Sequence, residues 1–290
     1  MFGVLLIIII FAILTIYLKK YFNFSEFFNS SVLKDSKHVE QYLNTIHYNQ
    51  YKNKISNLNK IKITKLEFKN IYLSKIHIIP NNLKLFLKKY TDIADNIIKK
   101  YKLYSLINIP WKFLISQSGL EGNMPYTLDN YIIFTEDYLL DNKKYNYDLV
   151  ITLIHEKIHI LQRRYQDKFN RFYKSYYNFL KFNIHPFKLP NKLRKIYMNN
   201  PDSNFDIWIY EYKNILFYPL LAKKKNQYID VGFDFKSLKP INIKKIKKFF
   251  KFGNNISFYH PNEIFACSFS DDLINSNPCI KQINFIRKLR

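Results

Sequence analysis

The sequence predicts an α+β fold behind a single amino-terminal transmembrane helix, and three observations lead to this prediction. Apolar residues fill positions 2–18. Helical and strand patterns follow one another as helix, strand, strand, helix between residues 80 and 164. Strand-like residues then gather near 206–235. We therefore expect an anchor at 1–20, a membrane-proximal stalk or small accessory region at 21–79, and one globular domain at 80–290 with a β-rich insertion near 206–235.

The apolar run, FGVLLIIIIFAILTIYL, is followed directly by Lys19 and Lys20. As a helix it would be ~26 Å long, close to the hydrocarbon thickness of a bilayer. A cleaved signal peptide would need basic residues before the run and a small-x-small site after it, and neither is present. Because the positive charge follows the run, we expect the large domain on the cytosolic side. Glycosylation sequons at Asn23 and Asn29 would suit the opposite side.

Composition indicates a folded chain and leaves its partners open. The 290 residues are 48% hydrophobic and 18% aromatic, enough for a sizeable core. The net charge of +24 is typical of proteins that bind nucleic acid or anionic membranes. The chain is also crowded with Lys, Asn, Ile, Phe and Tyr, which have A/T-rich codons, so base composition accounts for much of the lysine. We do not predict a nucleic-acid partner.

Local patterns predict the remaining elements. Residues 61–79 alternate like one or two strands, and apolar residues recur at helical spacing after Pro80. Strands are expected at Trp111–Ile115 and Asn130–Thr135. Further helices are expected at 167–182, 189–199 and 241–251, and another from Pro261.

One motif carries the chemistry: His155-Glu156-x-x-His159, on the helix that follows these strands. Histidines four residues apart leave a helix on the same face and can bind one Zn²⁺ at ~2.0–2.1 Å. Glu156 lies beside that face and can accept a proton from the water that the metal activates. The motif is flanked by Leu and Ile, which indicates a buried helix whose polar groups need a partner.

Chance alone rarely gives this pattern. With 7 His and 22 acidic residues, it would arise on the order of once in a hundred such chains. The alternatives are a solvated helix with incidental histidines, which the apolar flanks disfavour, and a buried histidine pair bonded to the backbone. Only Cys267 and Cys279 are present and no CxxC occurs, so a thiolate zinc site is not expected. We predict Zn²⁺ as the cofactor.

A catalytic zinc site needs a third protein ligand. The pattern that supplies a third histidine downstream is absent, because Gln162 stands in place of its Gly and Tyr165 in place of its His. Glu263 is the best candidate, since it follows Pro261 at the start of an otherwise apolar helix. The competing acids are Asp167, Asp206 and Glu211.

The pair HEKIH and HPNEIFA resembles the zincin metallopeptidases of the gluzincin type. The resemblance covers roughly residues 80 to 275. It implies helices packed on a small mixed sheet, with Asn123–Phe134 at the edge strand that borders the cleft. It also implies zinc bound by His155, His159 and Glu263, Glu156 as general base, and a protein or peptide substrate. The chain is similar, too, to uncharacterised zincin-like proteins of large DNA viruses, which would put it in a viral or host membrane.

Two features depart from that family. The gap from His159 to Glu263 is 263 − 159 = 104 residues and must hold an insertion. The family often places an Asp four residues after the glutamate ligand to orient a histidine, and here Cys267 takes that position.

A peptidase also needs a hydrogen-bond donor to the oxyanion that forms during the reaction. Tyr259 is the first choice for it, with His260 and Tyr126 as alternatives.

The sequence therefore supports two hypotheses. The first is a membrane-anchored, zinc-dependent metallopeptidase. The second is a non-catalytic, membrane-tethered basic protein that uses a zincin scaffold for binding. They differ in whether Glu263 reaches the two histidines.

Overall fold

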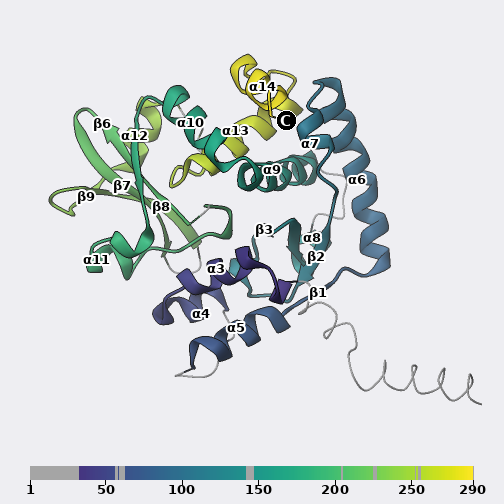
Figure 1. The fold of residues 1–290 in the computed structure, drawn as a ribbon, viewed down its shortest axis with the longest axis horizontal. Helices are drawn as coiled ribbons and strands as arrows, with labels where there is room; N and C mark the ends of the chain where they lie inside the picture. Colours follow the sequence, from purple (N-terminus) through teal and green to yellow (C-terminus); the bar gives the residue numbers. More distant parts are fainter. Residues whose placement is uncertain are drawn as a thin grey trace, which may run out of the picture.

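The computed structural model describes residues 33–55, 58, 63–141, 147–203, 205–224, 227–251, 253 and 256–289. In this part of the chain, helices surround one mixed and one antiparallel sheet, which confirms the α+β class (Figure 1). The transmembrane run expected at 2–18 lies outside the described residues. Among the helices inside them, none combines the length and the apolar character needed to cross a bilayer.

The mixed sheet has four short strands in the order β1-β2-β4-β3. β2 and β4 are parallel, whereas β1 and β3 are antiparallel to their neighbours. Because side chains alternate along a strand, Ile132 and Phe134 join the core on one face and Ile133 the core on the other. β3 is an edge strand, as expected within Asn123–Phe134. The strands are β1 (Ile76–Ile78), β2 (Phe113–Ser116), β3 (Tyr126–Leu128) and β4 (Tyr131–Thr135).

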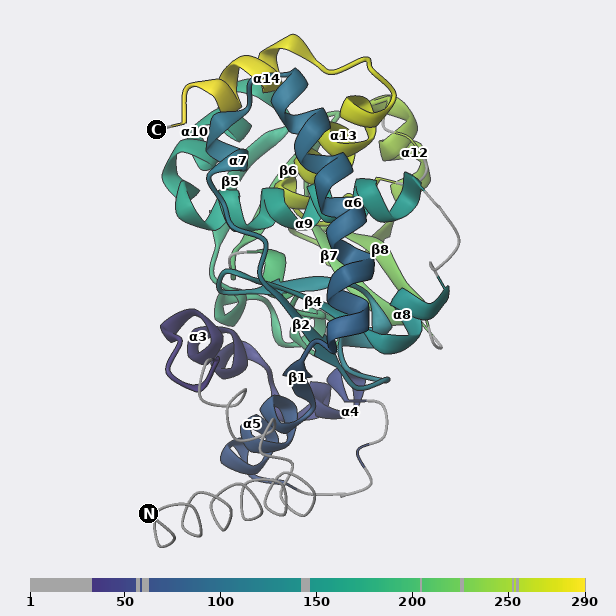
Figure 2. The ribbon, with the colours of Figure 1, turned by 90° about the vertical axis from the view of Figure 1, so that its right-hand side faces the viewer.

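A group of helices packed around the motif helix covers one face of this sheet, and the expected helix after Pro80 belongs to it (Figure 2). The motif-bearing α9 is apolar on most of its surface and has Arg163 and Arg164 in its last turn, where cations suit the helix dipole. The helices of this layer are α6 (Asn81–Lys100), α7 (Tyr104–Ile107), α8 (Glu136–Asp141), α9 (Tyr147–Arg164), α10 (Gln166–Tyr176), α13 (Pro261–Ile274) and α14 (Ile280–Arg287).

Three helices cover the opposite face of the mixed sheet: α3 (Lys37–Thr45), α4 (Tyr51–Lys54) and α5 (Lys65–Ser74). Of the one or two strands expected within 61–79, one is present as β1, whereas the strand-like residues before it form the helix α5. A capping box explains the difference. Thr64 and Glu67 each bond the other's backbone N–H, which starts a helix at that point.

The strand-like residues near 206–235 form strands, and the antiparallel sheet to which they belong extends beyond this range, with the order β5-β6-β7-β8-β9. The helix expected over 167–182 ends at Tyr176, because Leu180 and the residues after it pair with β6. Residues 189–199 hold only the short α11 (Asn191–Arg194), whereas α12 (Ile243–Phe249) is confirmed. The strands are β5 (Leu180–Ile184), β6 (Ile207–Tyr212), β7 (Ile215–Lys224), β8 (Gln227–Asp234) and β9 (Pro240–Ile241).

A buried ion pair joins α4 to the loop that leads to β3. Lys54 Nζ lies 2.6 Å from Glu121 Oε2, and the two side chains are 2% and 6% exposed. Tyr42 and Tyr72 donate hydrogen bonds to the other oxygen of the same carboxylate. Residues close to the amino terminus of the described chain therefore share one polar network with the mixed sheet's loop.

Removing Glu121 should destabilise the fold, because it takes away the carboxylate that the other members of the network bind. We expect Glu121→Ala to lower the free energy of unfolding by roughly 3–5 kcal/mol, because Lys54 stays buried without its carboxylate. Urea unfolding measures the change. Asp92→Ala, which breaks the exposed Lys88–Asp92 pair, is the matched control and should shift it by less than about 1 kcal/mol. Equal effects for the two variants would show that burial adds nothing to the Lys54–Glu121 pair.

Candidate metal centre

The crossing of α9 and α13 brings the two sequence motifs together. Gln162 Nε2 on α9 donates a 3.0 Å hydrogen bond to the main-chain carbonyl of Asn262 on α13. Earlier on α9, His155 lies beside Cys267, which comes later on α13. Residue numbers thus fall along one helix as they rise along the other, so the helices are antiparallel. The motif face of α9 consequently meets the first turns of α13.

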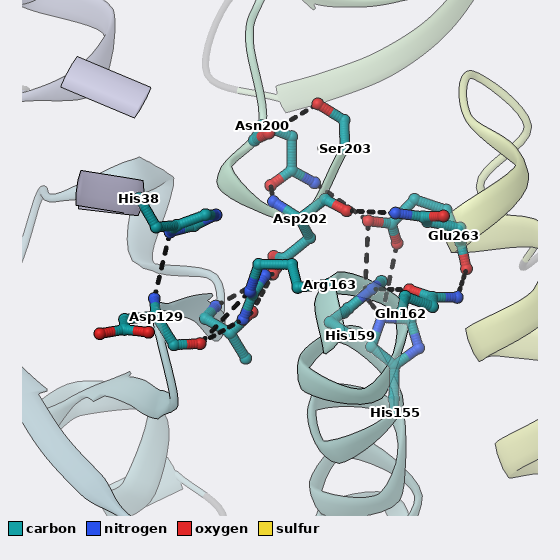
Figure 3. A network of polar contacts seen from close by, with 12 residues as sticks. His38, Asp129, His155, His159, Gln162, Arg163, Asn200, Asp202, Ser203 and Glu263 are labelled. Carbon is teal, nitrogen blue, oxygen red and sulfur yellow. Dashed lines mark hydrogen bonds and ion pairs between the residues drawn. The ribbon is translucent and has the colours of Figure 1, made fainter. Parts of the chain in front are cut away.

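Three donor groups converge at this crossing (Figure 3). The Nε2 atoms of His155 and His159 are 2.8 Å apart. The Glu263 carboxylate lies 3.4 Å from His155 Nε2 and 3.5 Å from His159 Nε2. Donors that share one tetrahedral Zn²⁺ lie roughly 3.3 Å apart, so two separations match and the histidine pair is somewhat closer. The three predicted ligands are therefore together, at separations close to those between zinc donors.

Gln162, which occupies the position of the missing glycine, orients His159. Its Nε2 must donate to the Asn262 carbonyl, and so its Oε1 is the atom that faces His159 Nδ1, at 2.7 Å. An amide oxygen only accepts, so Nδ1 carries the proton and Nε2 keeps its lone pair toward the centre. Tyr173 closes the network by accepting from Gln162 and donating to Asn262 Oδ1. No sequence pattern indicated this role.

Glu263 is held by two donors. The Tyr259 hydroxyl donates to Glu263 Oε1 at 3.0 Å, and Asn200 Nδ2 donates to the same atom at 3.1 Å. Asn200 also donates to the Tyr259 hydroxyl. Despite burial, which acts to raise it, the pKa of Glu263 is lowered by His159 and His155. Tyr259, expected as an oxyanion donor, is thus in the site, but its hydroxyl is bonded to Glu263.

The competing acids lie elsewhere. Asp167 is exposed on α10. Asp206 accepts a hydrogen bond from Asn183 at 2.9 Å, and Glu211 forms an ion pair with Lys181 at 2.6 Å. His260, the alternative oxyanion donor, caps α13 by accepting from Asn262 N. Burial lowers its pKa to about 3, so it stays neutral.

Glu156 lies beside the donors with a carboxylate oxygen to spare. Its side chain is buried, and Oε2 has no hydrogen-bond partner among the described residues. Burial and then the charge of Asp202 raise the pKa of Glu156 well above its usual range. Asp202 is held by Arg163 and by the backbone N–H of Thr127 on β3. Sequence reasoning missed Asp202 and Arg163, because their roles depend on a loop that folds back over α9.

Cys267 lies on α13, four residues after Glu263. Its sulfur, one nitrogen of His155 and one oxygen of Glu263 all lie within 4.8 Å of one another, as do ligand atoms of Glu156, His159 and Asp202. Burial opposes the charged form of His155, but Cys267, Glu263 and Glu156 together raise its pKa well above the usual value. The Cys267 sulfur is therefore a neighbour of His155.

The site opens into a cavity of about 950 Å³. Its walls include the motif face of α9, the α13 face that carries Glu263, the loop at 199–202 and the start of edge strand β3. An edge strand can bind an extended polypeptide through its unpaired N–H and C=O groups, although the Thr127 N–H of β3 is already bonded to Asp202. No family model, curated protein or solved structure matches the chain.

The bond between Gln162 and His159 leads to a testable prediction. We expect Gln162→Ala to weaken Zn²⁺ binding by roughly 10- to 100-fold, because His159 loses the acceptor that fixes its tautomer and ring orientation. Competition with a chelating dye measures the affinity. Gln41→Ala, at an exposed position on α3, is the control and should bind as the wild type does. Unchanged affinity in Gln162→Ala would contradict the orienting role.

Proposed function

We propose that the protein is a zinc-dependent metallopeptidase. The observation that carries the proposal is the convergence of His155, His159 and Glu263, within 2.8–3.5 Å, beside the buried carboxylate of Glu156. Two imidazoles and one carboxylate, with a position left for water, form the donor set of catalytic zinc sites in peptidases. The non-catalytic alternative predicts that Glu263 points away from the two histidines, whereas its carboxylate faces them.

Each residue has a role in this proposal. Bound Zn²⁺ supplies Lewis-acid chemistry, which polarises a carbonyl group and makes water a better nucleophile. Glu156 accepts a proton from the attacking water and passes it to the leaving amine. Burial raises the pKa of Glu156, which makes its carboxylate a stronger base than a free one. Gln162 orients His159, and Tyr259 with Asn200 positions Glu263.

The cellular setting follows from the sequence alone. We propose a single-pass membrane protein anchored by residues 2–18, with the catalytic domain on the cytosolic side of a viral or host membrane. The substrate would be a protein or peptide, since the cavity borders the edge of a sheet.

Metal content tests the ligand set. We expect about one zinc per chain in the purified full-length wild type and a large loss in Glu263→Ala, because three protein ligands are required. Elemental analysis after dialysis against a weak chelator gives the stoichiometry. Glu211→Ala removes an acid that the structure places outside the site, and it should retain the metal. Full zinc content in Glu263→Ala would exclude Glu263 as a ligand.

Turnover tests the base. Glu156→Gln should keep its zinc but lower kcat by roughly 10²–10⁴-fold, because the amide cannot accept the proton of the attacking water. A library of internally quenched peptides serves as substrate. Glu136→Gln, at an exposed position on α8, is the control and should retain wild-type activity. Undiminished zinc-dependent cleavage by Glu156→Gln would contradict the mechanism.

A further inference from the structure

The cavity is acidic although the chain is strongly basic. Its lining includes seven acidic residues and one lysine, whereas the whole chain has 46 basic and 22 acidic residues. Four of the seven lie in ion pairs or at the reaction centre: Glu121 pairs with Lys54, Asp202 with Arg163, and Glu156 and Glu263 belong to the reaction centre. The other three are Asp148, Asp271 and Asp272, and we call them the acidic end of the cavity.

The antiparallel crossing puts these three carboxylates at the same end. Asp148 precedes His155 by seven residues, about two turns, and so lies on the same face of α9. Asp271 follows Cys267 by one turn on the face of α13 that carries Glu263. Since Cys267 is beside His155, the next turn of α13 runs toward the start of α9. All three side chains line the cavity.

Two of these acids have no cationic partner within the described residues. The Asp271 carboxylate accepts from the neutral amide of Asn275, and no ion pair there includes Asp271 or Asp272. Partial burial and the neighbouring Asp271 raise the pKa of Asp272. Two adjacent carboxylates without a cation favour a positively charged ligand.

A second feature of the cavity points independently to a hydrogen-bond donor as ligand. Glu156 Oε2 is buried, lines the same cavity and has no partner among the described residues. A buried carboxylate oxygen needs a donor, and the groups of a substrate chain beside the reaction centre supply one. The cavity is therefore built for a polar occupant that extends from Glu156 toward the acidic end.

We propose that the acidic end of the cavity binds a lysine or arginine side chain of the substrate polypeptide. The inference rests on the proposed peptidase function for the class of substrate. At ~1.5 Å per helical residue, Asp148 and Asp271 lie roughly 10–12 Å along their helices from His155 and Glu263. An extended chain advances ~3.3 Å per residue. The basic residue therefore lies roughly three residues from the bond that is cleaved.

Binding to a full-length protein that cannot turn over tests the proposal. Fluorescent peptides of one neutral sequence, with lysine or norleucine at each position in turn, are titrated into zinc-loaded Glu156→Gln. We expect lysine to bind about fivefold more tightly than norleucine at one position, the gain of an ion pair worth about 1 kcal/mol. Equal affinity at every position would overturn the proposal.

Further variants in the Glu156→Gln background locate the subsite. Asp271→Asn with Asp272→Asn should bring the lysine-to-norleucine ratio close to one, whereas Asp167→Asn, an exposed acid outside the cavity, should leave it unchanged. If the double variant kept the full ratio, the assignment to α13 would be wrong. Asp148→Asn alone should lower the ratio, which provides a test should the double variant fail to fold.

Peptide binding and peptide cleavage together distinguish the acidic subsite from the proposed peptidase function. A lysine preference in binding together with no peptide cleavage by the wild type would count against the peptidase function alone. Cleavage of peptides by the wild type with no lysine preference in binding would count against the acidic subsite alone.

Discussion

The antiparallel contact between α9 and α13 is the constraint on which the centre depends. Gln162 spans it, because its amide bonds His159 on its own helix and the Asn262 carbonyl on the other. One side chain thereby fixes the distance between the helices and the tautomer of a ligand. Tyr173 and Asn262 complete a buried network in which each polar group has a partner, and such networks hold one arrangement because a lost partner is costly.

Burial governs the chemistry of the groups inside this contact. Water is excluded from His159, whose pKa burial lowers to about 3, so its imidazole stays neutral and its lone pair remains available. The same exclusion raises the pKa of Glu156. The pKa of Glu263 is lowered instead, because the two histidines stabilise its carboxylate more than burial destabilises it. The surroundings of these two glutamates, which lie on facing helices, thus shift their pKa values in opposite directions.

Much of the fold followed from local patterns. The helix after Pro80, the strands around Phe113 and Ile132 and the motif helix have periodicities that burial on one face imposes. The errors fall where a different force decides. At Thr64 a capping box outweighs strand-like alternation, and at Leu180 pairing with β6 overrides a helical pattern. Pairing with a distant strand leaves no trace in a short window of sequence.

The sequence by itself determined that His155 and His159 share one face of a helix beside Glu156, and it pointed to Glu263 as the first candidate for a third ligand. Spacing on a helix sets which side chains share a face, and Pro261 marks where the second helix begins. Only the tertiary structure decided that Glu263, and not Asp167, Asp206 or Glu211, faces the histidines. It also decided the roles of Gln162 and Asn200 and the gathering of acids at one end of the cavity. These features depend on the angle at which α9 and α13, which are far apart in the chain, cross each other. Packing across the whole core sets this angle.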